Sequence, residues 1–502
     1  MLETKTKQYI LSFSFIIFIT LTFILILNHE PWADEAQAWL LSQDLSIGQL
    51  LFHQLRYEGS PGLWHLTLHV LSSQDLPYLS MNLISGFFGV LSAFLIYRYS
   101  PFPFYVKVLL PFTYFIFYQY SIVARSYSMI VPLLFTLAIL HPNRHSKSLQ
   151  YSILLCLLAN VSLHGSLISL ALFMVFLYEL FMINHKSITA VIELHWKSIV
   201  LFSFMASYLV IFLYPSDDVI LGTVIRLNPL RSVVILLLSL VDSLGSNLWL
   251  MVSRPDTTST IQLLKTALGL CASLNFVYLS MRFFWRSRTL HYLLFPFLLL
   301  YLLFTFKHVQ FWHIGIITVL WIFVMWISLN TKQNSVPNKN AVSIKTINLS
   351  FFLIMSIQLI WSFNAIQYDM GNSYSASKDM ANYIKETIPA NSELYGSSYY
   401  EISLLPYFER NIYANHNEGS NERFWSWSIS QPSMQLQKTP QVPIGSYLVI
   451  SDRNLVDYYG NSYRVSDYDL EDFIFLKKFE GGLFWKNEPL ETDNYYLFIK
   501  SF

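Results

Sequence analysis

Apolar stretches long enough to cross a membrane recur along the first three quarters of the chain. A helix needs about 20 residues to cross the hydrocarbon core of a bilayer. The pattern therefore predicts a polytopic α-helical membrane protein with about 11 spans. We expect these spans near residues 10–27, 77–97, 104–121, 126–141, 149–163, 166–183, 197–214, 261–283, 290–306, 309–329 and 346–364.

Basic residues in the short loops predict the orientation of these helices, because such residues stay on the cytoplasmic side. The N-terminus is basic and its apolar stretch is followed by no small-residue cleavage site, which indicates a retained signal anchor. The remaining basic clusters fit an odd number of crossings, with the N-terminus inside and the C-terminal region outside. The basic residues of the inner side are Lys5, Lys7, Arg98, Lys107, Arg144, Lys147, Lys186, Lys197, Arg282, Arg286, Arg288, Lys332, Lys339 and Lys345.

The apolar stretch 231–252 has two interpretations. It carries Asp242, Gly245 and Asn247 in its middle, and the odd number of crossings holds only if it does not cross. A re-entrant or interfacial helix satisfies that condition. An ordinary span whose polar residues pack against neighbouring helices is equally compatible with the pattern.

Beyond residue 365 the sequence becomes polar and rich in Tyr and Asn. We expect a membrane domain at 1–365, which includes a long outer loop at 28–76, and a soluble extracytoplasmic α/β domain at 366–502. Residues 378–388 have a helical period and 445–452 read as a buried strand. The end of the chain predicts a hairpin at 473–485 and an edge strand at 494–502.

The outer loop 28–76 holds the strongest candidate for chemistry. It contains two amphipathic stretches, 34–43 and 61–73, that are too short to span and are expected to lie along the membrane surface. Adjacent carboxylates at Asp34 and Glu35 open the first stretch. The local pattern alone favours a helix cap, because Gln37 follows Asp34 at capping-box spacing and Glu35 complements the helix dipole. The other polar candidates of the loop are His53, Arg56, Glu58 and His65.

Further polar residues fall at the predicted outer ends of other spans. They are Arg125, His164, Lys307, His308 and His313. Charged groups near hydrocarbon are retained mainly where they pair or line a functional cavity. A lone basic residue there is more often a snorkelling side chain, and a lone histidine is more often packed in the core. Convergence of several such residues on one membrane face favours a site.

The net charge, the missing motifs and the cysteine spacing exclude several other kinds of site. The formal net charge of +1 gives no field that would attract nucleic acid. The sequence has no phosphate-binding glycine-rich loop, no HExxH metal motif, no serine nucleophile motif and no Rossmann pattern. Cys156 and Cys271 lack metal or redox spacing. Any donor substrate would therefore have to arrive through the membrane.

Taken together, these segments resemble the GT-C superfamily of polyprenyl-phosphate-sugar-dependent glycosyltransferases, near the branch of protein mannosyltransferases and lipid A aminoarabinose transferases. The resemblance rests on the signal anchor, the acidic pair in WADEAQ, the two surface stretches, EGSPGLWHL at 58–66, ARSYSM at 124–129 and the outer C-terminal domain. The branch often has His-Pro-Pro or Lys-Pro-Pro before its second surface helix. This chain has Gly59-Ser60-Pro61-Gly62 there.

The resemblance implies an inverting transfer from a polyprenyl-phosphate sugar to a lipid, glycan or protein acceptor, in a bacterial plasma membrane. Asp34 would be the general base, and Arg125 and Lys307, with His308, would stabilise the leaving phosphate. Glu35, a catalytic candidate beside Asp34, would with His53 and Glu58 position substrate or contact a divalent cation. Arg56, His164 and His313 would position substrate. A transporter of lipid-linked sugars and a non-catalytic envelope assembly protein remain alternatives. In the C-terminal domain, Trp425 and Trp427 are expected to pack the core or rest on the membrane interface rather than stack on sugars.

Overall fold

The computed structural model describes residues 2–219, 228–253, 259–307, 309–332, 343–430, 441–453, 455–456, 462–463, 465 and 468–501. The chain folds as two compact units, and each unit combines segments that are distant in the sequence. The first unit comprises Met1–Phe23, Ser85–Leu213 and Val224–Phe363. The second comprises Ile24–Ile84, Tyr214–Thr223 and Asn364–Phe502.

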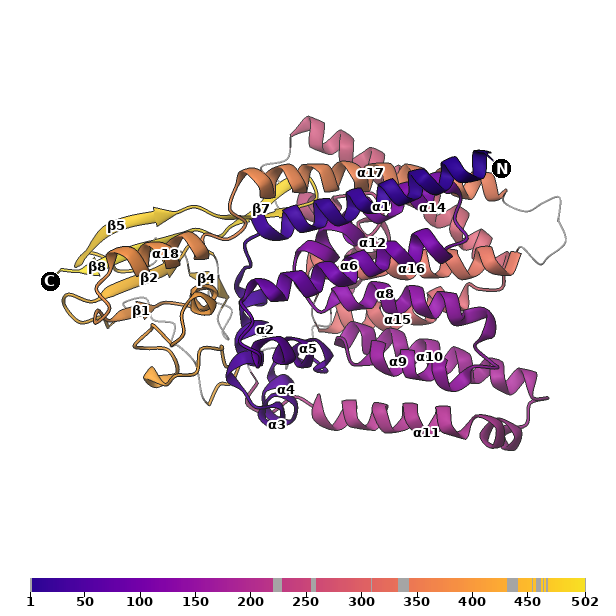
Figure 1. Cartoon of the computed structure of the whole chain (residues 1–502), viewed down its shortest axis with the longest axis horizontal. Helices are drawn as coiled ribbons and strands as arrows, with labels where there is room; N and C mark the ends of the chain where they lie inside the picture. The colour runs from indigo at the N-terminus through magenta and orange to yellow at the C-terminus, as the bar shows by residue number, and fades with distance from the viewer. Residues whose placement is uncertain are drawn as a thin grey trace. The chain divides into compact units, whose positions relative to one another are not determined.

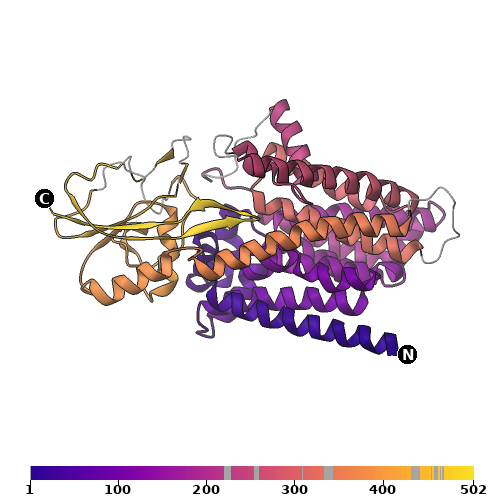
Figure 2. The ribbon, with the colours of Figure 1, turned by 90° about the horizontal axis from the view of Figure 1, so that it is seen from above.

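Long apolar helices dominate the first unit (Figures 1 and 2). Among the described residues, seven helices are long and apolar enough to cross a membrane, which identifies a helical membrane protein. They are α1 (Leu2–Asn28), α6 (Leu79–Tyr99), α10 (Leu163–Ile183), α11 (Ile188–Phe212), α14 (Thr260–Arg286), α16 (Phe311–Lys332) and α17 (Ile344–Gly371). Each contains one of the predicted spans or most of it.

Four further apolar helices are shorter than a usual span. They are α8 (Tyr127–Leu140), α9 (Ser148–Ala159), α12 (Pro229–Val241) and α15 (His291–Phe306). The spans predicted at 126–141, 149–163 and 290–306 fall on three of them. At about 1.5 Å per residue each is shorter than the roughly 30 Å of a hydrocarbon core.

The span predicted at 104–121 is wrong as one continuous helix. The structure divides it into α7 (Phe104–Leu109), a 3₁₀ turn η2 (Leu110–Phe112) and a π-helix η3 (Phe115–Ile122). Pro111 has no backbone N–H to continue the helix, and Thr113 has an extended backbone with ψ 148°. Both features interrupt the helical hydrogen-bond ladder.

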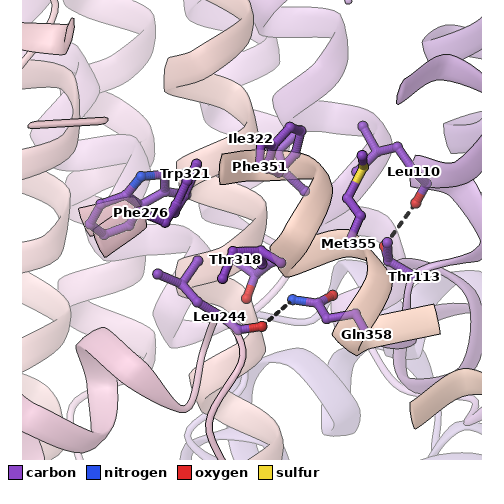
Figure 3. A pocket seen from close by; sticks show the side chains of 11 residues that line it. Leu110, Thr113, Leu244, Phe276, Thr318, Trp321, Ile322, Phe351, Met355 and Gln358 are labelled. Carbon is purple, nitrogen blue, oxygen red and sulfur yellow. Dashed lines mark hydrogen bonds between the residues drawn. The ribbon is translucent and has the colours of Figure 1, made fainter. Parts of the chain in front are cut away.

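The stretch 231–252 is also broken, between α12 and α13 (Leu248–Ser253). The Asp242 carboxylate accepts hydrogen bonds from the backbone N–H groups of Leu248 (2.8 Å) and Trp249 (2.6 Å), so it caps the start of α13. Side chains of three other helices complete the hydrogen bonding of the turn. Ser273 Oγ accepts from Gly245 N (3.0 Å), Thr318 donates to the Ser243 carbonyl, and Gln358 Nε2 donates to the Leu244 carbonyl at 2.8 Å (Figure 3).

The turn between α12 and α13 packs against positions of α14 and α16 that lie away from the ends of these helices. A Cβ atom on Gly269 of α14 would come within 2.1 Å of the Gly245 carbonyl oxygen, so the backbones touch there. Gly269 and Thr318 each lie about two turns of helix inside α14 and α16. Irregular backbone at membrane depth requires such burial and such polar partners. The structure therefore excludes one continuous helix over 231–252.

The second unit contains the outer loop and the C-terminal region. The loop forms α2 (Ala33–Asp44), α3 (Ile47–Gln49), η1 (Leu50–Gln54), α4 (Leu55–Glu58) and α5 (Leu63–Ser72), which confirms the helices predicted at 34–43 and 61–73. Helix α18 (Ser377–Thr387) confirms the helix predicted at 378–388. The irregular part between the first two strands of the C-terminal sheet includes the 3₁₀ segments η6 (Tyr399–Tyr407) and η7 (Asn417–Gly419).

A four-stranded sheet lies in the C-terminal region, with the order β1-β2-β8-β5. Its strands are β1 (Leu394–Gly396), β2 (Tyr447–Ser451), β5 (Phe473–Phe479) and β8 (Tyr495–Lys500), and only β1 and β2 are parallel. Leu448, Ile450 and Phe498 form its buried core with Val442. Two short pairs accompany it: β3 (Leu455–Val456) with β4 (Ser462–Tyr463), and β6 (Gly482–Trp485) with β7 (Glu488–Thr492).

Two strand predictions are wrong. Residues 473–485 are not a hairpin, because β5 pairs with β8 while β6 pairs with β7. The last strand is not an edge strand, since β8 lies between β2 and β5. Gly481 explains the exit of the chain after β5: a Cβ atom there would come within 2.5 Å of Ala376 N, so only glycine permits this approach.

The two compact units do not coincide with the two predicted domains, 1–365 and 366–502. The unit that holds 364–502 also holds the outer loop, because charged groups of the loop find their partners in the C-terminal region. The Glu30 carboxylate accepts from Ser377 Oγ (3.2 Å) and from Lys378 N at the start of α18. At the other end of α2, Asp44 forms a buried ion pair with Arg423.

Candidate functional site

Asp34 lies in the first turn of α2 and does not cap it. The helix begins after Trp32, and the side chain that accepts from the Trp32 backbone N–H is Glu35 Oε2, at 3.2 Å. The local prediction of a cap at Asp34 is therefore wrong, and Gln37 is not its capping-box partner. Asp34 Oδ1 instead accepts a hydrogen bond from Tyr399 Oη at 3.0 Å, and the side chain is only half-buried.

Glu35 differs from its neighbour because it is completely buried. Its Oε2 atom lies 3.5 Å from His29 Nε2, and His29 Nδ1 lies 2.9 Å from Asp369 Oδ2. Burial opposes the charged imidazolium, but the carboxylates of Asp369 and Glu35 outweigh it and raise the pKa of His29 to about 10. Glu35 thus neutralises a buried cation. It is placed to position the start of α2 rather than to meet substrate.

The remaining loop candidates are spread over the second unit. Gln37 Nε2 donates to Glu58 Oε1 at 2.7 Å, which gives Glu58 a role in holding α4 against α2. His53 is exposed on η1 and Arg56 is half-buried on α4. Within the described residues, no group of three or more His, Cys, Asp or Glu side chains could hold a metal ion.

Arg453 is a buried cation of the second unit that the sequence did not single out. Its Cζ atom lies 4.3 Å from the centre of the Trp32 ring and 4.6 Å from that of Tyr400. Its Nε atom donates to Glu491 Oε2 at 3.0 Å. Burial opposes the charge, but Tyr400, Asp493, Glu491 and Asp34 outweigh it and hold the pKa of Arg453 above its ordinary value. No sequence signal distinguishes this arginine, because its partners come from three separate segments.

The first unit brings three predicted residues together. The rings of His164, at the start of α10, and His313, near the start of α16, have centroids 4.5 Å apart. The Tyr127 ring lies 5.7 Å from each of them. The Arg125 Cζ atom lies 5.8 Å from the ring centres of both Tyr127 and Trp312. The structure thus brings Arg125, His164 and His313 close to Tyr127 within this unit.

The other two candidates of the first unit lie next to α15. Lys307 is exposed and directly follows the last residue of that helix, Phe306. The ring of Phe304, in the last turn of α15, lies 5.7 Å from His164. His308 lies outside the described residues.

Each unit therefore holds its own group of candidate side chains. The second unit has a half-buried carboxylate that accepts from a tyrosine hydroxyl. The first has an arginine against Tyr127, and the ring of this tyrosine lies near those of two histidines. No protein-family model matches the chain, and no curated protein matches its sequence. The fold defines a helical membrane protein with a small sheet-containing region near its C-terminus.

Proposed function

We propose that this protein is a membrane glycosyltransferase that moves a sugar from a polyprenyl-phosphate donor to an extracytoplasmic acceptor. The main support is the difference between neighbouring polar side chains on α2. Glu35 is completely buried, and Gln37 and Asp44 hydrogen-bond residues 423–425, whereas Asp34 is half-buried and accepts from the Tyr399 hydroxyl. A partly exposed carboxylate that is oriented by a tyrosine hydroxyl suits a general base.

Asp34 is the base in this proposal. It removes the proton from an acceptor hydroxyl or amine while that nucleophile attacks the anomeric carbon of the donor sugar. The bond from this carbon to the phosphate oxygen breaks, its electron pair leaves with the polyprenyl phosphate, and the configuration inverts. The hydrogen bond from Tyr399 orients the carboxylate.

The leaving phosphate gains charge in the transition state, and fixed cations lower the cost of that charge. Arg125 is the first candidate, since it lies beside Trp312 and beside Tyr127, whose ring lies near those of His164 and His313. Lys307 and His308 are proposed to assist. His164 and His313 are positioned to orient the arginine or the donor.

The direct test is transfer by the purified full chain from radiolabelled polyprenyl-phosphate sugars to candidate lipid, glycan and protein acceptors. Asp34→Asn should reduce turnover by about 10²–10⁴-fold, the usual contribution of a general base. Asp75→Asn is the matched control, because Asp75 is an exposed carboxylate of the same loop. Full activity of Asp34→Asn would remove the assigned base. Absence of transfer with every donor and acceptor would reject the enzyme.

One observation favours a second function. The structure has two interrupted helical segments, at 104–122 and at 229–253. Transporters use such discontinuous helices to build substrate sites. A transporter of lipid-linked sugars is therefore the alternative, and it predicts movement of a labelled polyprenyl-phosphate sugar across a liposome membrane without transfer. Asp34→Asn would leave the rate of that movement unchanged.

A further inference from the structure

Residues 423–430, called the aromatic strap below, are held in the second unit by three polar anchors. The Arg423 backbone and side chain donate to Asp44, at the end of α2, with 2.8 Å from the backbone nitrogen to Oδ2. Gln37 pairs with the Trp425 backbone in both directions, each bond 2.8 Å long. The hydroxyls of Ser428 and Ser430 donate to Asp218.

The third anchor also connects the strap to another segment of the unit. The Asp218 carboxylate further accepts from Ser216 Oγ (2.7 Å) and Tyr57 Oη (3.0 Å). These hydroxyl donors, those of Ser428 and Ser430 first, keep the pKa of Asp218 below its ordinary value. The hydrogen bonds that fix the course of the strap thus come from its backbone, its serines and Arg423.

The strap carries two tryptophans beside the candidate base. The Tyr399 ring lies 4.8 Å from the Trp427 ring and 5.8 Å from the Trp425 ring, and the hydroxyl of this tyrosine bonds Asp34. Trp425 is buried and packs the interior, as expected from the sequence. Trp427 is only half-buried. An aromatic ring that is partly exposed therefore lies one side chain away from Asp34.

This combination suits a sugar ring. A pyranose has an apolar face of C–H groups that packs on an aromatic ring, and an edge of hydroxyls that bonds carboxylates. Trp427 offers the aromatic ring. Asp34 and the Tyr399 hydroxyl offer the polar partners at the adjoining edge.

We infer that Trp427 and Tyr399 form the acceptor subsite and bind a pyranose ring of a glycan acceptor, with one hydroxyl directed to Asp34. This inference rests on the proposed transfer reaction and narrows its acceptor from a lipid, glycan or protein to a molecule that carries a sugar. A ring packed on Trp427 brings its own hydroxyl to the base, so binding and orientation of the nucleophile are achieved together.

Binding can be tested without knowledge of the donor. The full chain, purified in a detergent without a sugar headgroup, is mixed with the methyl pyranosides of glucose, galactose, mannose and N-acetylglucosamine, and saturation transfer to their ring C–H protons is measured by NMR. The wild type should saturate at least one glycoside. Trp427→Ala should lose most of that signal, and Trp427→Phe should retain part of it because a ring remains. Ile429→Ala is the matched control, since Ile429 is an exposed apolar residue of the strap.

The outcomes separate this inference from the reaction on which it rests. Equal saturation by wild type and Trp427→Ala, or none by wild type, overturns the subsite. Thermal unfolding of each variant identifies misfolding. If Trp427→Ala is misfolded, the saturation measured with Trp427→Phe decides for or against the subsite. If transfer is found, Trp427→Ala should raise the acceptor KM about tenfold and leave the donor KM unchanged. If sugar binding depends on Trp427 but no transfer is found, the subsite is kept and the enzyme is rejected. If transfer is found but does not change in the Trp427 variants, the enzyme is kept and the subsite is rejected.

Discussion

Replacing Gln37 by leucine tests the central anchor of the aromatic strap. The substitution keeps the size of the side chain and removes its amide, which accepts from Trp425 N and donates to Trp425 O and to Glu58 Oε1. Both Trp425 backbone bonds are buried. A buried polar group left without its partner costs about 1–3 kcal/mol. Two such groups should lower the free energy of unfolding by about 2–6 kcal/mol, unless the strap moves away from α2 and its backbone groups reach water.

Hydrogen exchange at the Trp425 amide measures directly how well the bond from Trp425 N to Gln37 Oε1 protects it. In the wild type its exchange requires the strap to open, and each 1.4 kcal/mol lost from that opening accelerates exchange about tenfold. Gln37→Leu should therefore accelerate the Trp425 amide by at least about tenfold and lower the unfolding temperature. Gln37→Glu keeps an acceptor for Trp425 N but loses the donor to Trp425 O and faces Glu58, so it should also destabilise.

The matched control is Gln43→Leu, because Gln43 is an exposed glutamine on the same helix. It should leave both the exchange rate and the unfolding temperature near the wild-type values. An unchanged Trp425 exchange rate in Gln37→Leu would refute the amide-to-backbone pairing, and with it the fixed course of the strap.

Three further substitutions test other contacts. Tyr399→Phe removes the hydrogen bond to Asp34 but keeps the ring, so in a transfer assay turnover should fall about tenfold with little change in unfolding temperature; equal turnover would contradict the orienting role. Burial lowers the pKa of His416 to about 4 from 6.5, so between these values only the unfolded chain binds the proton. Stability should be full above pH 6.5 and fall by about 3 kcal/mol towards pH 4, and His416→Gln should flatten that dependence in unfolding measured from pH 7 to 4.5. Gln358→Leu leaves the Leu244 carbonyl without its partner and should cost about 1–3 kcal/mol in detergent, whereas an unchanged unfolding temperature would show that the turn after α12 does not need this bond.

Periodicity identified most helices of this chain because local hydrophobicity decides whether a segment enters a bilayer. The long apolar runs became α1, α6, α10, α11, α14, α16 and α17. Amphipathic spacing likewise located α2, α5 and α18. The interruption at Thr113 was missed, since an apolar run with one proline resembles a continuous helix until its hydrogen bonds are traced.

Strand pairing was less predictable, because adjacency in sequence does not fix adjacency in a sheet. The pattern of 473–485 resembles a hairpin, yet β5 takes β8 as its partner. What redirects the chain is the close approach of Gly481 to Ala376, a contact between positions far apart in sequence. Only the folded chain contains that information.

For the candidate site, the sequence alone determined which residue types were available: an acidic pair at the start of a surface helix, and cations at the ends of distant helices. The tertiary structure decided how each is used. Glu35 is buried against His29, Asp34 meets Tyr399, Arg125 lies near the paired histidines, and Arg453 joins Trp32 and Tyr400. The physical reason is that burial and partner choice depend on contacts between segments hundreds of residues apart, whereas periodicity and capping patterns report only on neighbours along one helix.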